Sequence, residues 1–289
     1  RDRDVTGVQT CALPICMLGV LVLVIAVSFF SNLQFNKNVD KEVKEFFSGV
    51  ENKGGIIQRA DLEGLPPVVQ KWMEQSQVVG KERIAAVRLK QKVSMRLKEG
   101  GPWMPADVQQ YFRVDEPGFI WQVKVDMAPL LYFAGKDKYE EGRGHMLIRF
   151  LSLVKVADAT GKEIDQGAML RYLAESVWFP TAALSNYIKW EEMDANSARA
   201  TMTYGGITVS GVFTFNQKGE VVNFVAQRYG DFNGQYLMKT WVVNMKEHKH
   251  FNGIRIPSVG EVIWRLETGD YNWYQFEIKD IEYNKPAVY

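Results

Sequence analysis

The chain has 289 residues, of which 46% are hydrophobic and 24% charged, a composition typical of globular proteins. Lys and Arg number 35 and Asp and Glu number 34, so the formal net charge is +1. This balance argues against a nucleic-acid-binding protein, which usually carries a basic surface, and against a disordered charged chain. Aromatic residues make up 12%, enough to fill a large core or to line a cavity.

The first 16 residues are expected to be foreign to the protein. Residues 5–15, VTGVQTCALPI, resemble the translation of a sequencing adapter, and segments of this kind are excluded from fold reasoning. The two cysteines of the chain, Cys11 and Cys16, lie inside this string and at its edge. The remainder therefore offers no thiol for a disulfide, a zinc site or a cysteine nucleophile.

Residues 17–35 are predicted to be a transmembrane anchor. They begin MLGVLVLVIAVSFF, with no charge before Lys37, and a membrane-spanning helix needs about 20 apolar residues. A cleaved signal peptide is the alternative, but Ala26-Val27-Ser28 is a weak cleavage site, and a buried core helix is a third option. We expect a single-pass membrane protein with a cytosolic start and an extracytoplasmic body.

Residues 36–66 are predicted to be a juxtamembrane linker, and residues 67–289 a single β-rich domain. The linker contains charged and apolar residues, with a short helix predicted over 41–50, and it ends in the helix-breaking segment DLEGLPP. Beyond it, period-two alternation predicts half-buried strands, with Val87, Leu89 and Val93 on one face of the first. A meander with tight turns at Gly205-Gly206 and Asn252-Gly253 follows.

Two apolar segments are predicted to be helices that interrupt the strands, residues 127–134 (MAPLLYFA) and residues 166–188, which Pro180 divides. Helices do not alternate with single strands, so a parallel doubly wound sheet is excluded. The predicted fold is mainly β (α+β): one large bent antiparallel sheet or unclosed barrel, with a few helices plugging its concave face.

Several blocks resemble an uncharacterised bacterial family of membrane-anchored β-rich proteins. They are residues 61–70 (DLEGLPPVVQ), Trp103-Met104-Pro105, residues 118–121 (GFIW), and residues 170–175 (LRYLAE) with 178–182 (WFPTA). Ala168 departs from the Glu expected there. The layout is also similar to the lipoprotein-carrier superfamily of LolA-like and LolB-like half-barrels. These resemblances imply an architecture, an envelope location and a plausible hydrophobic cavity, but no activity.

Four polar residues are candidates for a site. Arg171 and Glu175 are four apart on a predicted helix and can pair on its surface, either as a structural pair or as part of a site. Asp137 and Tyr139 are expected in a loop, where functional polar residues often concentrate. An ordinary turn is the alternative.

No metal site, cofactor or catalytic residue is predicted. His248 and His250 are two apart on a strand and face the same way, but zinc needs three or four ligands and the sequence indicates no third. A solvated edge explains these histidines as well. Hydrolase and phosphate-binding motifs are lacking from the sequence.

The aromatic residues are the stronger functional signal, because several predicted strands would place them on one inner face. Such a face forms either a solid core or a lined pocket. The predicted ligand-binding residues are Trp103, Phe119, Trp121, Trp178, Phe179, Leu184, Trp241 and Trp264.

The leading functional prediction is therefore a non-catalytic, membrane-anchored domain that binds a lipid or similar hydrophobic molecule in a half-barrel. The segment from Trp178 to Leu184 is expected to move away from the mouth. A cell-envelope scaffold or interaction module without ligand is the alternative. A hydrolase-like enzyme using Asp137, His145 or Glu175 is the third reading.

Overall fold

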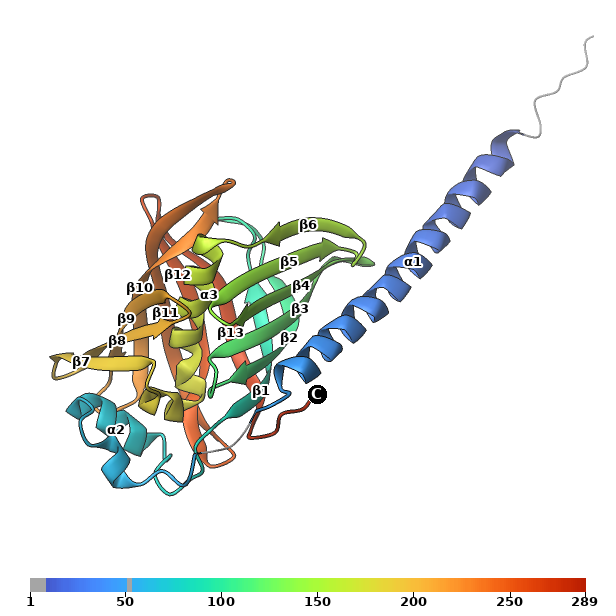
Figure 1. Ribbon diagram of the computed structural model, residues 1–289. Helices are drawn as coiled ribbons and strands as arrows, with labels where there is room; N and C mark the ends of the chain where they lie inside the picture. The colour runs from blue at the N-terminus through green and yellow to red at the C-terminus, as the bar shows by residue number, and fades with distance from the viewer. Residues whose placement is uncertain (1–8, 51–53) are drawn as a thin grey trace, which may run out of the picture.

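The protein is one curled antiparallel sheet with a helix inside the curl and a long helix leaving it (Figure 1). The structure is a computed structural model that describes residues 9–50 and 54–289, with side chains from residue 17 onward. The string 1–16, predicted to be foreign, lies outside the described side chains.

Thirteen strands form the sheet. Strands consecutive in the chain are neighbours except β6 and β7, which form the two edges, and β1 pairs with β13 in the middle. Their bounds are β1 Ala86–Met95, β2 Met104–Arg113, β3 Gly118–Ala128, β4 Leu131–Glu140, β5 Arg143–Phe150, β6 Val154–Ala159, β7 Ile188–Asp194, β8 Ser197–Tyr204, β9 Ile207–Phe215, β10 Val221–Phe232, β11 Gln235–Phe251, β12 Ile254–Leu266 and β13 Gly269–Tyr283. The order across the sheet is β6-β5-β4-β3-β2-β1-β13-β12-β11-β10-β9-β8-β7. The predicted mainly β, half-barrel fold is confirmed.

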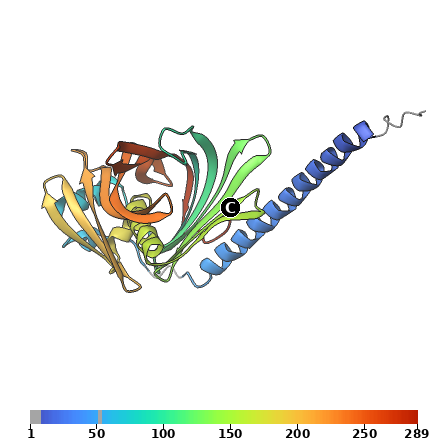
Figure 2. The same ribbon diagram turned by 90° about the horizontal axis from the view of Figure 1, so that it is seen from above.

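The sheet curls until its two halves approach each other (Figure 2). The turn between β4 and β5 meets the turn between β8 and β9, where a Cβ on Gly142 would lie 2.8 Å from the Cα of Gly205. Both glycines have positive φ angles, 78° and 57°. Side chains at these positions would force the turns apart, so the pair permits the close approach of the two halves.

The helix α3 (Lys162–Glu175) lies against the concave face, where it contacts β3, β4, β5, β9 and β10. Two 3₁₀ turns, Ser176–Trp178 and Pro180–Leu184, continue it. The shorter α2 (Pro67–Gln75) follows a 3₁₀ turn at Arg59–Leu62 and packs near β8. Pro180 divides the helical insert as predicted.

The long helix α1 (Gln9–Phe46) contacts the opposite, convex face of the sheet. Phe35, Val39, Val43, Phe46 and Phe47 are buried there against Ala86, Tyr111, Ile120, Tyr132 and Ala134. Polar contacts fix the same half, since Lys136 Nζ donates to Glu42 at 2.6 Å and Arg113 to the carbonyl of Phe46 at 3.1 Å. The apolar contacts therefore seat the helix on the domain over about three turns.

Two local predictions are wrong. Residues 127–134 form the turn and edges of the β3–β4 hairpin rather than a helix, because Pro129 and the positive φ of Leu130 (66°) favour a tight turn. Asp137 and Tyr139 lie within the second half of β4 rather than in a loop. The alternation of apolar and polar residues that would predict a strand is weak in β4, because Gly135 and Lys136 interrupt it.

The segment Trp178–Leu184, expected to move as a lid, is part of the core. Phe179 and Ala182 are fully buried, and Thr181 Oγ1 accepts the buried N–H of Ile84 at 3.0 Å. Trp178 is held from both sides, since its indole N–H donates to Pro257 O at 3.2 Å and its carbonyl accepts the hydroxyl of Tyr283 at 2.9 Å. Displacing this segment would break buried hydrogen bonds in several elements, so its movement would be costly.

Candidate ligand-binding cavity

The concave face is not completely filled, and it encloses a cavity of about 410 Å³. This volume lies in the range of small-molecule sites. Its wall comes from α3 and from the inward faces of strands in both halves of the sheet. The apolar lining residues are Met95, Leu97, Trp121, Val123, Val125, Phe133, Met146, Ile148, Val156, Ala174, Val177, Trp178, Trp241, Val243, Met245, Val262, Trp273 and Phe276.

The predicted aromatic residues divide between this wall and the core behind it. Trp121, Trp178 and Trp241 line the cavity. Phe119, Phe179 and Trp264 are buried in the surrounding core, and Leu184 is partly buried against it. Trp103 lies outside, in the connection from β1 to β2, where the guanidinium of Arg96 stacks on its ring at 4.0 Å.

A polar cluster interrupts the apolar wall. Arg171 of α3 bridges two carboxylates, with its Nε 2.8 Å from Glu175 and its Nη1 2.9 Å from Asp137 of β4. Glu175 also accepts the side-chain amide of Gln110 at 2.7 Å, which in turn accepts the amide of Gln91. The predicted Arg171–Glu175 pair thus exists, but it faces the cavity instead of the outer surface, and Asp137 joins it.

Burial dominates the electrostatics of this cluster. Desolvation raises the pKa of Asp137 and of Glu175, even though Arg171 opposes the shift. Burial works against the charged form of Arg171 too, but its two carboxylates together raise its pKa. The guanidinium of Arg171 also stacks over Phe119 and Trp121, at 4.8 and 5.0 Å. Both carboxylates are therefore held by an arginine and are not free bases.

Tyr139, the remaining polar candidate, does not reach the cavity. It is fully buried between Phe119 and Tyr172, with ring centroids 6.2 Å from each. Its hydroxyl has no hydrogen-bond partner among the described residues, and burial raises its pKa. Its position is that of a core residue.

The sequence reasoning missed Arg228, which lines the cavity from β10. Phe224, Ala226 and Arg228 are two apart and so share the inner face of that strand. The first two belong to the core, so the alternation alone could have indicated an inward-facing arginine. Burial, followed by the nearby charge of Arg171, lowers its pKa to about 10.

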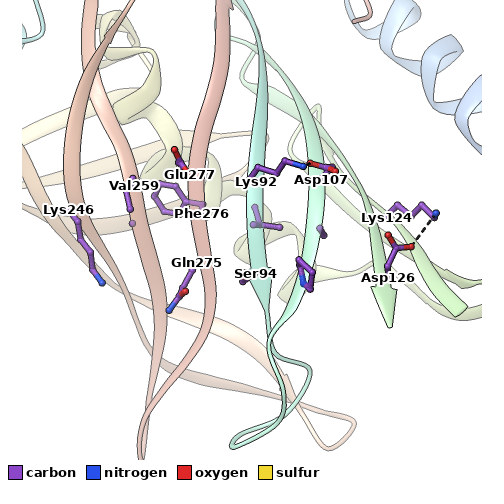
Figure 3. A pocket seen from close by; sticks show the side chains of 14 residues that line it. Lys92, Ser94, Asp107, Lys124, Asp126, Lys246, Val259, Gln275, Phe276 and Glu277 are labelled. Atoms are coloured by element: carbon purple, nitrogen blue, oxygen red, sulfur yellow. Dashed lines mark ion pairs between the residues drawn. The ribbon is translucent and has the colours of Figure 1, made fainter. Parts of the chain in front are cut away.

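A larger groove, of about 730 Å³, lies on the outer face of the sheet (Figure 3). Several of its side chains are charged and already paired, Lys92 with Asp107 at 2.5 Å and Lys124 with Asp126 at 3.2 Å. Because these groups are well exposed and neutralise each other, the groove offers no desolvated surface to a ligand.

The histidines form no metal site. His145 pairs with Asp158 on the outside at 2.7 Å, and the ring of His248 contacts the carbonyl of Val221 at 3.0 Å, while His250 is exposed. Across the part of the chain that the structure describes, no cluster of three potential ligands occurs.

Comparison with known families now places the domain. The model of a family of unknown function, DUF6544, matches residues 55–276. The chain belongs to this family. The match takes in the β strands up to β13, α2 and α3. No curated protein matches the chain.

Solved structures give the DUF6544 domain distant relatives in shape. A LolA superfamily protein from Nitrosomonas europaea is 10% identical, with a TM-score of 0.42, covering 74% of this chain and 92% of that one. A DUF1329 family protein from Desulfovibrio piger is also 10% identical, with a TM-score of 0.38, covering 76% and 93%.

One helix is long and apolar enough to cross a membrane, over residues 17–46 of α1. Its first half, from Met17 to Phe30, exposes nearly all of its large apolar side chains. An exposed apolar helix is costly in water, and the segment has the length and composition of a membrane anchor or a signal sequence.

Proposed function

We propose that the protein is a membrane-anchored, extracytoplasmic binding protein that holds one hydrophobic molecule, such as a lipid, in its half-barrel cavity. It performs no catalysis on that molecule. The observation that carries this proposal is the cavity of about 410 Å³, walled mainly by apolar side chains from α3 and both halves of the sheet.

Two further features support the proposal. Protein interiors are normally close-packed, so an apolar cavity of this size is unusual. An apolar ligand that filled it would remove its own apolar surface from water, and this burial would favour binding. The helix α1 would keep the domain beside the bilayer, which is the source of such ligands. Its second half is seated on the sheet, so the anchor and the domain would move as one body.

A scaffold without ligand would be expected to have a solid core, and the cavity therefore disfavours this alternative. The enzyme alternative requires convergent acid–base groups, but Asp137 and Glu175 are each paired with Arg171. His145 lies on the outer side of β5, paired with Asp158, and so away from both.

The test uses a variant that fills the cavity. Val243 of β11 lines it and is buried, so Val243→Phe adds a ring to the space that the ligand would occupy. Thr240→Phe, on the outward face of the same strand, is the matched control. The full chain is purified in detergent, and organic extracts of each variant are compared by mass spectrometry.

A stoichiometric hydrophobic compound in the parent and the control, but lost from Val243→Phe, is the expected result. Equal extracts from all three would contradict the proposal. Stability gives an independent reading, because adding a large group to a well-packed core costs about 1–3 kcal/mol. A cavity accommodates the ring with little loss of stability.

A further inference from the structure

Arg228 gives the cavity a cationic group without a charged partner. Its Nε donates to the carbonyl of Gly167 at 3.1 Å, and its guanidinium lies over the rings of Trp241 and Trp264, at 5.0 and 5.6 Å. Within the described part of the chain no carboxylate lies in ion-pair distance of it. Its two Nη groups have no hydrogen-bond acceptor there either.

The neighbouring carboxylates act on Arg228 through space, but they make their ion pairs with Arg171. Asp137 and Glu175 are oriented toward Arg171, and Glu175 also accepts from Gln110. The indole N–H of Trp241, beside Arg228, is buried and has no acceptor among the described residues. Around Arg228 and Trp241 the cavity therefore carries N–H donors without acceptors, although the charges of Asp137 and Glu175 act on Arg228 through space.

Arg228 is partly buried, and an arginine withdrawn from water is stabilised by a compensating anion or a network of acceptors. Planar guanidinium groups bind carboxylates and phosphates through paired hydrogen bonds. Burial makes the charged form of Arg228 costly, which is the condition under which an incoming anion gains most from pairing with it.

We infer that the ligand is an anionic amphiphile, whose carboxylate or phosphate group pairs with Arg228 while its apolar tail fills the cavity. This inference rests on the proposed function and narrows it to a ligand class. Uncharged lipids would bind the same wall without this pairing.

The test compares amphiphiles that share one tail. Dodecanoate, dodecyl phosphate and uncharged dodecanol are offered to the full chain, and bound fractions are measured by native mass spectrometry after release from detergent micelles. Because charge-assisted hydrogen bonds contribute strongly, we expect the parent to prefer either anion over dodecanol by about 10- to 100-fold. Arg228→Gln should abolish the preference, and Arg228→Lys should retain part of it.

Equal binding of all three by the parent would overturn the inference but leave the proposed function standing. Failure to bind any of them would refute the proposed function itself. If Arg228→Gln lost dodecanol as strongly as the anions, the arginine would support the cavity wall instead of a headgroup. A preference for only one anion identifies which of the two groups the site takes.

A second, independent observation concerns the ends of the β3–β4 and β5–β6 hairpins, here called the rim, which lie beside α1. Ser28 of α1 contacts the ends of two hairpins, with its hydroxyl 3.0 Å from both Leu151 O and Tyr132 Oη. Asn32 accepts from Ser152 at 3.1 Å. Exposed apolar side chains cluster on the same hairpins, namely Met127, Leu130, Leu131, Val154 and Val156.

The helix sets the depth of this rim. The first charged residue after the apolar segment is Lys37, and Ser28 precedes it by about 13 Å of helix. If the hydrocarbon boundary falls just before Lys37, the hairpin ends that touch Ser28 reach the level of the bilayer. Leu130 is 65% exposed and has a positive φ of 66°, a turn position that normally favours Gly or Asn.

We propose that the β3–β4 and β5–β6 hairpin ends insert into the same bilayer as α1. Val156 also lines the cavity, so this contact would place one side of its wall at the membrane. Lipid could then enter the cavity without crossing water.

The test labels one site at a time with an environment-sensitive fluorophore. Because the body lacks cysteine, Leu130→Cys is labelled specifically once Cys11 and Cys16 are replaced by Ser. Lys218→Cys, in the β9–β10 turn that contacts α2, is the matched control. In nanodiscs containing nitroxide-labelled lipid, we expect strong quenching at residue 130 and little at 218.

An unquenched label at residue 130, with the chain resistant to carbonate extraction, would refute membrane contact of the rim while keeping the anchor. Equal quenching at both sites would also refute it. Complete extraction by carbonate would refute the anchor on which this proposal depends.

Discussion

Removing the cation between two partly buried carboxylates should destabilise the domain strongly. Arg171 is held at 2.8 Å from Glu175 and 2.9 Å from Asp137, and the side chains of Arg171 and Glu175 are 14% and 13% exposed. Arg171→Met removes the cation but leaves Asp137 and Glu175 without their ion-pair partner, with Glu175 keeping only the amide of Gln110. Breaking a buried ion pair by removing one partner costs about 3–5 kcal/mol.

The pH dependence of this loss follows from the sign of the shifts. Both carboxyl pKa values are already raised by burial in the parent, and removing Arg171 raises them further. A carboxyl whose folded pKa exceeds its unfolded pKa loses stability as pH rises between the two values. The variant should therefore be closer to the parent at pH 5 than at pH 8, because protonation removes the unpaired charges.

A compensated variant separates this explanation from a general packing defect. Combining Arg171→Met with Asp137→Asn and Glu175→Gln removes all three charges with little change in volume. Such replacement is often nearly neutral, so most of the lost stability should return.

The measurement is urea unfolding of the full chain in detergent, followed by tryptophan fluorescence at pH 5 and pH 8. The midpoint and the slope are compared between variants, since an unchanged slope assigns the shift to stability. The reasoning fails if Arg171→Met costs less than about 1 kcal/mol at pH 8, or if the triple variant is as unstable as the single one.

Three other predictions concern the frame around the cavity. Burial lowers the pKa of His248 from 6.5, so the unfolding free energy should fall as pH drops below that value; the slope between pH 7 and 5 should be shallower in His248→Gln. Thr181→Val leaves the buried N–H of Ile84 without its acceptor and should cost about 1–3 kcal/mol in urea unfolding, whereas Thr181→Ser should cost less. Gly211→Ala should lower stability by about 1–3 kcal/mol, because its Cβ would lie 2.2 Å from the Phe224 ring; an unchanged melting temperature would contradict this.

Period-two patterns were sufficient to predict most of the sheet. Val87, Leu89 and Val93 alternate with lysines in β1, and they are buried as expected. Asn252-Gly253 predicted a hairpin, and both residues have the positive φ that such a turn requires. These features depend on neighbours in the chain, so the sequence contains the information for them.

The MAPLLYFA segment shows where local reading fails. Its apolar run suits a helix or a strand, and only pairing of β3 with β4 decides between them. The polar candidates also show that local sequence patterns do not predict contacts between residues distant in the chain. Arg171 and Glu175 were identified by their spacing, but their partner Asp137 is 34 residues away in sequence and meets them through the curl of the sheet.

By itself, the sequence determined the class of fold, the apolar N-terminal helix and the turns, because alternation, length and glycine placement act over a few residues. Tertiary structure alone decided which aromatic residues line a cavity and which fill the core. It also decided that residues 178–184 form a fixed core segment, that α1 packs on the convex face, and that Arg228 faces the cavity without a carboxylate partner. Each of these depends on how far a thirteen-stranded sheet curls, a property that sums small twists over every strand and that no single segment specifies.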